Sequence, residues 1–349
     1  MKVSDLFSGV GGLSQGFVMA GFEIEIAIEY EKDIAFSFQK NHPSTDVYAG
    51  DIMSINFKEL HKEHPQIDIV IGGPPCQGFS QKGKRLSLND PRNFLFKEFV
   101  SFVEEFTPKY FVLENVPNII TTEKGFFKDE IIASFNAIGY DVCCGVLNAA
   151  DYGVPQDRKR AIFIGQIESL EIKLPEPSGE RNTVGDAIFD LPFIRSGEGS
   201  SPCSYDKDPY TQLQKALRGK SSVLYNHVAT NHSATALRRM SMVPIGEGGK
   251  VLPIKEQTKS IYSGTYCRLL ADEVASTITT RFDTPSSGRF THPLLNRCLT
   301  TREAARLQTF PDYYVFYGSK TSQMKQVGNA VPPYLAYAIA KTIKDNEDK

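Results

Sequence analysis

The sequence predicts an α/β protein with an open sheet domain and a second, small loop-rich domain. Short apolar runs alternate with amphipathic stretches in the first half of the chain, which is typical of βαβ units and a parallel sheet covered on both faces. The amino-acid composition changes near Leu174, where segments rich in Pro, Gly, Ser and charged residues begin. Ligands of such sheets bind beyond the carboxyl ends of the strands, so the loops after the apolar runs are the candidate sites.

The first half also predicts individual elements. The expected strands are Lys2–Phe7, Glu23–Ile28, Ile67–Ile71 and Tyr110–Leu113, and the expected helices are Gly12–Ala20 and Lys32–Asn41. Between about Leu174 and Thr301, few segments show the periodicity of an amphipathic helix. Helices are then expected at Arg302–Phe310, before Pro311, and at Pro333–Asp345. We therefore expect one domain from residues 1–172 and 325–349 and a small domain from residues 173–324.

Composition limits the class of protein. The chain has 349 residues, of which 41% are hydrophobic and 23% charged, as in ordinary globular proteins, and no apolar run reaches membrane-spanning length. The amino terminus lacks the features of a signal peptide, so a cytoplasmic location is expected. Six cysteines without a C-x-x-C pair indicate no disulfide framework. His227 and His232 have no cysteine partners nearby, and no metal site is expected.

Charge is unevenly distributed along the chain. The net charge is −2, but residues 196–297 carry 13 Lys and Arg against 8 Asp and Glu, and the remainder carries 26 against 33. A basic region attached to an acidic remainder suits a polyanion-binding module joined to an enzyme core. Chance segregation of charge is the alternative interpretation.

A glycine-rich loop follows the first apolar run. In DLFSGVGG (Asp5–Gly12) the glycines allow the backbone to approach a ligand closely. Glu29 follows about 20 residues later, where an acidic side chain can bind ribose hydroxyls, and Asp51 is placed to meet a base. The loop alone could be a plain tight turn, and either acid alone a solvated residue. Together they indicate a nucleoside-containing cofactor.

A cysteine follows another apolar run. GGPPCQGFS (Gly72–Ser80) comes directly after Ile67–Ile71, and the two prolines hold Cys76 on a rigid turn at the end of a strand. Such a setting is typical of an exposed nucleophile. A free cysteine is more often a small hydrophobe, but acidic and basic groups elsewhere in the sequence favour the nucleophile.

Those groups lie in two further segments. Glu114, in FVLENVPNI, ends an apolar strand and could protonate a ring nitrogen. The segment QDRKR is expected to be extended, so that alternate side chains project to one side as donors for a carbonyl oxygen and a phosphate. Taken alone, this segment would be a solvated edge strand. Its donors are Gln156, Arg158 and Arg160.

In this order, the segments resemble the motifs of the cytosine-C5 DNA methyltransferase family, of the bacterial restriction–modification type. Two later segments also match, LTTREAARLQTFPD (Leu299–Asp312) and QVGNAVPP (Gln326–Pro333), and the resemblance covers most of the chain outside about residues 170–270. It implies a Rossmann-like, S-adenosylmethionine-dependent methyltransferase sheet domain. The small domain then carries the target-recognition region, about residues 175–297.

The resemblance also implies roles for individual residues. Cys76 would attack C6 of a cytosine, Glu114 would protonate or hydrogen-bond N3, and Arg160 would bind O2 with support from Arg158 and Gln156. C5 would then accept the methyl group, which leaves S-adenosylhomocysteine. The target base has to be flipped out of the duplex. The cofactor pocket would be lined by Phe7, Gly9, Gly11, Glu29, Tyr30, Asp51, Ile52, Pro75, Leu95, Asn329 and Val331.

Two regions are expected to contact DNA. The polar, basic stretch Ser80–Asn93, which includes Lys82 and Lys84, resembles a loop that closes over DNA, although it could be a surface loop without a role. In the target-recognition region the candidate base readers are arginines, since Arg pairs well with guanine edges. They are Arg238, Arg239, Arg268, Arg281 and Arg289.

The expected partner is double-stranded DNA, with no membrane partner. We expect a monomeric, nucleoid-associated bacterial protein whose functional counterpart is a cognate restriction endonuclease. A tRNA cytosine methyltransferase is an alternative, but its Cys-Phe-Thr signature is absent from the sequence. A non-catalytic DNA-binding member is a second alternative, which the presence of Cys76, Glu114 and Arg160 disfavours. A nicotinamide-dependent oxidoreductase would leave the Pro-Pro-Cys loop unexplained.

Overall fold

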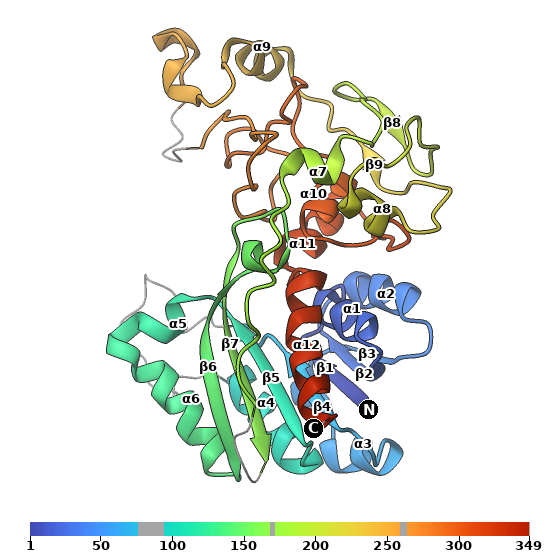
Figure 1. Cartoon of the computed structure of the whole chain (residues 1–349), viewed down its shortest axis with the longest axis vertical. Coiled ribbons are helices and arrows are strands. Elements are labelled where there is room, and N and C mark those ends of the chain that lie inside the picture. Colours follow the sequence, from blue (N-terminus) through green and yellow to red (C-terminus); the bar gives the residue numbers. More distant parts are fainter. Residues whose placement is uncertain (76–93, 168–171, 259–263, 349) are drawn as a thin grey trace. The chain divides into compact units, whose positions relative to one another are not determined.

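The computed structural model describes residues 1–75, 94–167, 172–258 and 264–348. They form two compact units (Figure 1). Unit 1 consists of residues 1–148, 159–177 and 333–349, and unit 2 of residues 149–158 and 178–332. Residues 149–158 and 325–332, which we expected in the sheet domain, thus belong to unit 2.

Unit 1 contains a seven-stranded sheet. The first five strands along the chain run parallel to one another, as predicted. β7 is antiparallel to both of its neighbours, so the sheet is mixed at this end rather than parallel throughout. Only residues 149–158 connect β6 to β7, too few for the helical crossover that a parallel pair requires. The strand order is β3 (Asp46–Ala49), β2 (Glu23–Glu29), β1 (Lys2–Leu6), β4 (Ile69–Gly72), β5 (Tyr110–Asn115), β7 (Lys159–Ile167), β6 (Tyr140–Asn148).

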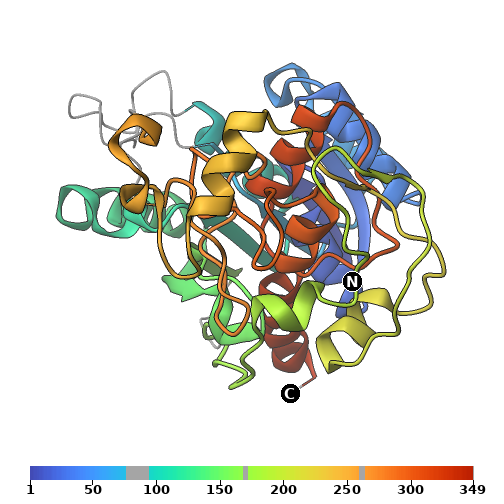
Figure 2. The ribbon, with the colours of Figure 1, turned by 90° about the horizontal axis from the view of Figure 1, so that it is seen from above.

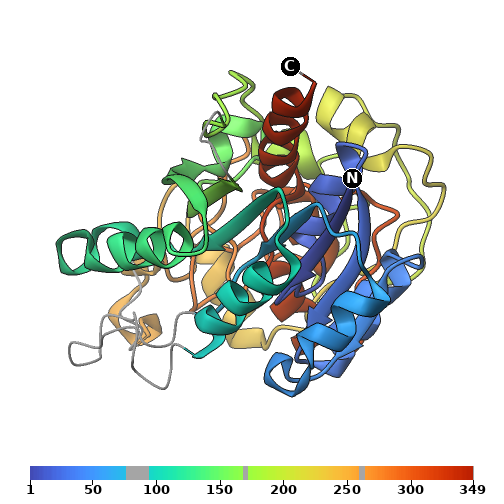
Figure 3. The ribbon, with the colours of Figure 1, turned by 90° about the horizontal axis from the view of Figure 1, so that it is seen from below.

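Helices cover both faces of this sheet. In Figure 3 the strands pass between α12 on one side and α3 and α4 on the other. α1 packs against α12 so closely that a Cβ on Gly16 would lie 2.3 Å from the Cβ of Ala336, which explains the glycine. No helix among the described residues has both the length and the apolar composition to cross a membrane. The helices of unit 1 are α1 (Gly12–Met19), α2 (Lys32–Asn41), α3 (Phe57–Glu63), α4 (Phe94–Phe106), α5 (Asn118–Thr121), α6 (Phe126–Asn136) and α12 (Pro333–Glu347).

Aromatic side chains fill the core between the sheet and two of its helices. Phe111 of β5 stacks on Phe135 of α6 with ring centroids 3.8 Å apart, and Phe99 of α4 meets both rings edge-on. Gly165 of β7 leaves room for this cluster, because a Cβ there would lie 1.9 Å from the Phe111 ring. Central strands buried on both faces account for the continuous apolar runs in the sequence.

Unit 2 is built mainly of loops with short helices (Figure 2). The helix expected at Arg302–Phe310 begins one residue earlier and ends at Leu307, while the terminal helix expected at Pro333–Asp345 belongs to unit 1 and extends to Glu347. A two-stranded sheet pairs β8 with β9. The α-helices and strands described in unit 2 are α7 (Val184–Ile188), β8 (Gly199–Ser200), α8 (Gln212–Arg218), β9 (His227–Val228), α9 (Ala234–Met242), α10 (Thr301–Leu307) and α11 (Lys320–Asn329).

Buried ion pairs hold the loops of unit 2 around α10. Arg297 donates two hydrogen bonds of 2.7 Å to Glu303, which also forms a capping box with Thr300 at the start of the helix. Arg306 pairs with Asp190 and Asp312, and all three side chains are fully buried. Removing one partner of such a pair typically costs about 3–5 kcal/mol. The charged residues of this segment therefore have a structural role in unit 2.

Candidate active site

The predicted cofactor residues of unit 1 gather at one edge of the sheet. β1 to β5 are parallel, so the loops that follow them all begin at their common carboxyl edge. Leu95 lies half-buried on α4, and the exposed Asn329 and the buried Val331 lie at and after the end of α11 in unit 2. The residues at the edge are Phe7, Gly9 and Gly11 after β1, Glu29 and Tyr30 at the end of β2, Asp51 and Ile52 after β3, and Pro75 after β4.

The loop after β1 is held open by Glu29. Its two carboxylate oxygens accept hydrogen bonds from the backbone N–H groups of Gly9, at 2.9 Å, and Glu31, at 2.8 Å. Gly9 has a φ of 55°, and a Cβ on this residue would have no atom within 4 Å, so a ligand can approach its backbone. Phe7 adopts a φ of 59°, which is a strained backbone conformation for a residue other than glycine. Such conformations are frequent at binding sites.

An aromatic and an acidic side chain after β2 and β3 are exposed to solvent. The Tyr30 side chain is 70% exposed, which leaves its ring available for stacking on a base. Asp51 is exposed and accepts a hydrogen bond from the Met53 N–H at 3.1 Å, while Ile52 is buried beneath. An open glycine backbone, an acidic group and an exposed ring at one edge fit an adenosine-containing cofactor.

A buried carboxyl group lies beneath the same loop. Asp5, on β1, is fully buried and accepts a hydrogen bond of 2.6 Å from the Ser14 hydroxyl of α1, while its Oδ1 has no hydrogen-bond partner among the described residues. Burial, with a contribution from the nearby charge of Glu29, raises the pKa of Asp5 to about 7. Asp5 therefore exchanges a proton near neutral pH.

We expect Asp5→Asn to flatten the pH dependence of the free energy of unfolding. Because the folded pKa lies above the ordinary value of 3.8, the wild type is stabilised below about pH 4 and loses that contribution as pH rises towards 7, by up to about 1.4 kcal/mol per pH unit. Urea unfolding at pH 4.5 to 8.5 measures this slope. Ser14→Ala removes a hydrogen bond that lowers the pKa and should extend the decline to higher pH, whereas parallel curves for wild type and Asp5→Asn would contradict the prediction.

Glu114 and Arg160 form an ion pair at the carboxyl edge. Glu114 lies in β5 opposite Ile162 of β7, and Arg160 lies near the start of β7. The Arg160 Nε and Glu114 Oε1 atoms are 2.7 Å apart, and the two side chains are 15% and 14% exposed. A Cβ on Gly73 would lie 2.7 Å from Glu114 Oε2. The carboxyl group thus lies against the backbone that leads to residue 76.

Gln156 and Arg158 do not extend this pair. Both side chains are almost fully buried in unit 2. The Arg158 guanidinium donates to the backbone carbonyls of Ile278, at 3.0 Å, and Gly328, at 2.9 Å. Gln156 donates to Leu307 O and accepts from the Ile278 N–H. The expectation of three donors on one face needs correction, because two of them are bound to backbone groups and only Arg160 reaches Glu114.

Several predicted residues lie outside the described residues. Cys76, Ser80, Lys82 and Lys84 belong to residues 76–93. Their proposed roles in catalysis and DNA contact stay predictions.

The candidate base readers of unit 2 differ in accessibility. Arg281 and Arg289 are exposed. Arg238 and Arg239 both pair with Glu256, at 2.9 and 3.4 Å. Arg268 is only 7% exposed and donates to the backbone carbonyls of His292, Leu295 and Met240. A guanidinium bound in this way supports loops rather than presenting donors at the surface, so the structure speaks against Arg268 as a reader.

The histidines singled out in the sequence have structural contacts. The ring nitrogens of His227 lie 3.0 Å from Thr300 Oγ1 and 2.9 Å from Pro192 O, and His232 Nε2 accepts from the Cys298 N–H. In the described part of the chain, no three His, Cys, Asp or Glu side chains gather to hold a metal ion.

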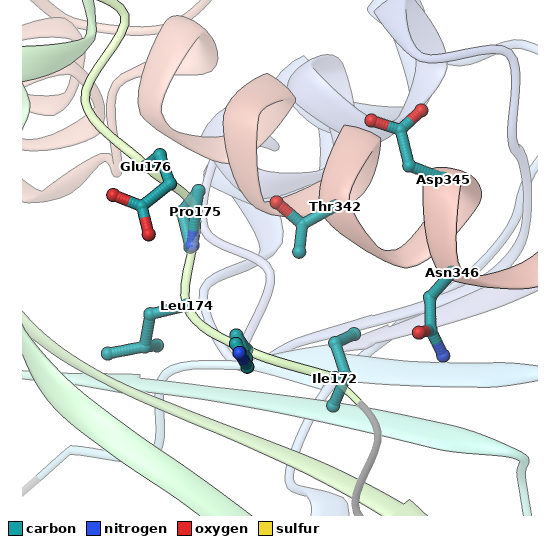
Figure 4. A pocket seen from close by; sticks show the side chains of 8 residues that line it. Ile172, Leu174, Pro175, Glu176, Thr342, Asp345 and Asn346 are labelled. Atoms are coloured by element: carbon teal, nitrogen blue, oxygen red, sulfur yellow. The ribbon is translucent and has the colours of Figure 1, made fainter.

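A hollow of about 370 Å³ lies elsewhere in unit 1 (Figure 4). Asn346, which helps to line it, donates a hydrogen bond to Tyr110, the first residue of β5, whereas Glu114 lies near the other end of this strand. The hollow is therefore separate from the candidate site. Its lining residues are Ile172, Lys173, Leu174, Pro175, Glu176, Thr342, Asp345 and Asn346.

Sequence reasoning missed the roles of two residues near the site. The sequence places Asp5 at the start of the glycine-rich loop and Asn115 within the segment FVLENVPNI, and it predicts no role for either side chain. Asn115 Nδ2 donates a hydrogen bond to Pro74 O at 3.0 Å. The available signal was a polar side chain at the end of an apolar strand, where a buried position requires a hydrogen-bond partner.

Comparisons with known proteins identify the family of the chain. A family model described as C-5 cytosine-specific DNA methylase matches residues 1–345. The type II methyltransferase M1.HphI of Haemophilus parahaemolyticus is 42% identical over 346 residues, which cover 97% of this chain and 85% of that protein. The type II methyltransferase M.DdeI of Desulfomicrobium norvegicum is 38% identical, covering 98% and 88%. A crystal structure from E. coli, described as a DNA modification methyltransferase encoded within a prophage, matches with a TM-score of 0.83 and 29% identity over all of both chains. The chain therefore belongs to the C-5 cytosine-specific DNA methylase family.

Proposed function

We propose that this chain methylates C5 of a cytosine in double-stranded DNA as the modification enzyme of a restriction–modification system. Family membership supports the reaction, and the type II relatives support the setting. The observation that carries the proposal is the Glu114–Arg160 pair, 2.7 Å apart, packed against the backbone that leads to Cys76.

The proposed chemistry divides the work among three side chains. The Cys76 thiolate adds to C6 of the cytosine, which forms the S–C6 bond. Glu114 donates a proton or hydrogen bond to N3 as electron density moves into the ring, and Arg160 fixes the Glu114 carboxyl group and binds O2. C5 then accepts the methyl group. The proton on C5 leaves, and elimination of the Cys76 sulfur from C6 restores the aromatic ring.

S-adenosylmethionine supplies the electrophilic methyl group when it is bound. The open backbone at Gly9, the Glu29 carboxylate and the exposed ring of Tyr30 fit its adenosine part. We propose that the other pocket residues of the family motifs take part, with Asn329 and Val331 of unit 2 assigned from the motif alone. The remaining members are Phe7, Gly11, Asp51, Ile52, Pro75 and Leu95.

DNA contact is proposed for unit 2 and for the loop after Cys76. Arg281 and Arg289 offer exposed guanidinium groups, while Ser80, Lys82 and Lys84 are assigned from sequence. We also propose that the protein is a monomer, that it is located in the cytoplasm in association with the nucleoid, and that a cognate restriction endonuclease is its functional counterpart.

Incubation of the protein with labelled S-adenosylmethionine and either genomic DNA or tRNA tests this function. We expect label in DNA only, with bisulfite-resistant cytosines inside one short sequence motif. Cys76→Ala protein serves as the control for contaminating activity. Label in tRNA alone would contradict the DNA substrate, and label in neither would favour a non-catalytic DNA-binding protein.

A further inference from the structure

Asn115 connects the end of β5 to the segment that follows β4. Its side chain is 6% exposed. Nδ2 donates to the backbone carbonyl of Pro74 at 3.0 Å, and Oδ1 accepts from the Val116 N–H at 2.8 Å. Since the donor end faces a carbonyl and the acceptor end faces an N–H, the amide has one orientation that satisfies both contacts.

Backbone pairing does not reach this segment. The register between β4 and β5 runs from Ile69↔Tyr110 to Gly72↔Leu113 and ends there. The next two residues on one side are Gly73 and Pro74, and on the other Glu114 and Asn115. Beyond the last backbone pair, the two segments are therefore connected by side chains of β5. Glu114 lies against Gly73, and Asn115 donates a hydrogen bond to Pro74.

Pro74 is a suitable point for such a contact. Pro75 has no N–H and a restricted φ, so the carbonyl of Pro74 is the hydrogen-bonding group of the peptide that joins the two prolines. Cys76 follows after one residue of fixed φ. Holding the Pro74 carbonyl therefore constrains where the chain enters residue 76.

We propose that Asn115 is a positioning residue that sets the nucleophile-bearing segment relative to the Glu114 carboxyl group. The inference rests on the proposed function, in which Cys76 and Glu114 act on one cytosine ring. An asparagine fits because one planar amide supplies a donor for Pro74 and an acceptor for Val116. Aspartate has the same shape but places a second carboxylate oxygen against the Pro74 carbonyl.

A change at Asn115 should affect the attack of the Cys76 sulfur on C6 rather than the binding of S-adenosylmethionine or DNA. Formation of the S–C6 bond requires the sulfur, the ring and the acid to be aligned, and a displacement of about 1 Å can slow such a step by about 100-fold. We therefore expect Asn115→Asp to reduce the single-turnover rate of methyl transfer by about 100-fold. The dissociation constants for S-adenosylmethionine and DNA should change by less than about threefold, because neither ligand is held by this amide.

The decisive readout is the rate of covalent attachment to DNA that contains 5-fluorocytosine at the target. Attachment requires attack and methyl transfer but stops before release, so Asn115→Asp should slow it by the same factor as turnover. Asn41→Asp is the matched control: Asn41 Nδ2 also donates to a backbone carbonyl, that of Ser37 at 2.7 Å, on α2 of unit 1. It should leave both rates unchanged. Asn115→Ala tests the same loss without an added charge.

The outcomes separate this inference from the proposed function. Attachment at the wild-type rate by both Asn115 variants would overturn the positioning role. A loss of rate that only matches the loss of cofactor-binding protein would also overturn it, because the role would then be structural. If the active wild type forms no adduct, the covalent mechanism of the proposed function fails, and the inference fails with it.

Discussion

Cys76→Ala is expected to reduce methyl transfer below detection while S-adenosylmethionine still binds with an affinity within about threefold of wild type. The variant lacks the thiolate that adds to C6, and without that addition C5 is a poor carbon nucleophile. Transfer of labelled methyl groups to DNA measures the first quantity, and calorimetric titration of the cofactor measures the second. Cys76→Ser should give the same result.

Cys143→Ala provides a matched control for the loss of a thiol. Cys143 lies half-buried in β6, and burial raises the pKa of its thiol to about 11, so little thiolate is available there. This variant should methylate DNA at the wild-type rate and form the adduct with 5-fluorocytosine DNA, whereas Cys76→Ala should form none. Undiminished turnover by either Cys76 variant would remove the covalent mechanism.

Glu114→Gln is expected to lower the single-turnover rate by about 10³-fold, within the range that general acids contribute. Glutamine keeps the size of the side chain but cannot give a proton to N3. The change also removes the negative partner that holds the Arg160 guanidinium at 2.7 Å. Rapid-quench measurement of methyl transfer with saturating DNA isolates this step from substrate binding.

Glu25→Gln is the control for the loss of a carboxylate from an ion pair. Glu25 lies near the start of β2, away from the carboxyl edge, and pairs with Lys2 at 2.9 Å. Its substitution should leave the transfer rate unchanged. A transfer rate for Glu114→Gln within a few-fold of this control would exclude Glu114 as the proton donor.

Local sequence patterns predicted the elements that carry the site. The apolar runs before Phe7, Glu29 and Glu114 became strands β1, β2 and β5, and their hydrophobic side chains are buried, as expected for strands covered on both faces. The loops were identifiable because glycine permits backbone conformations that other residues rarely adopt and proline fixes φ, and both effects are local.

The direction of β7 was not predictable in this way. Residues 159–167 have the composition of a strand, but their pairing with β5 as an antiparallel neighbour depends on the short connection from β6. That direction decides the site, because it brings the start of β7, and with it Arg160, to the carboxyl edge where Glu114 lies.

Residue types and their order determined by themselves the family, the reaction class and the candidate acid and nucleophile, since chemistry is a property of the side chain. Only the tertiary structure decided what each donor faces. Arg158 binds carbonyls of residues 278 and 328, Arg268 is buried among backbone carbonyls, and Arg160 pairs with Glu114. A guanidinium binds the acceptor that folding brings to it, and those acceptors lie up to 170 residues away along the chain.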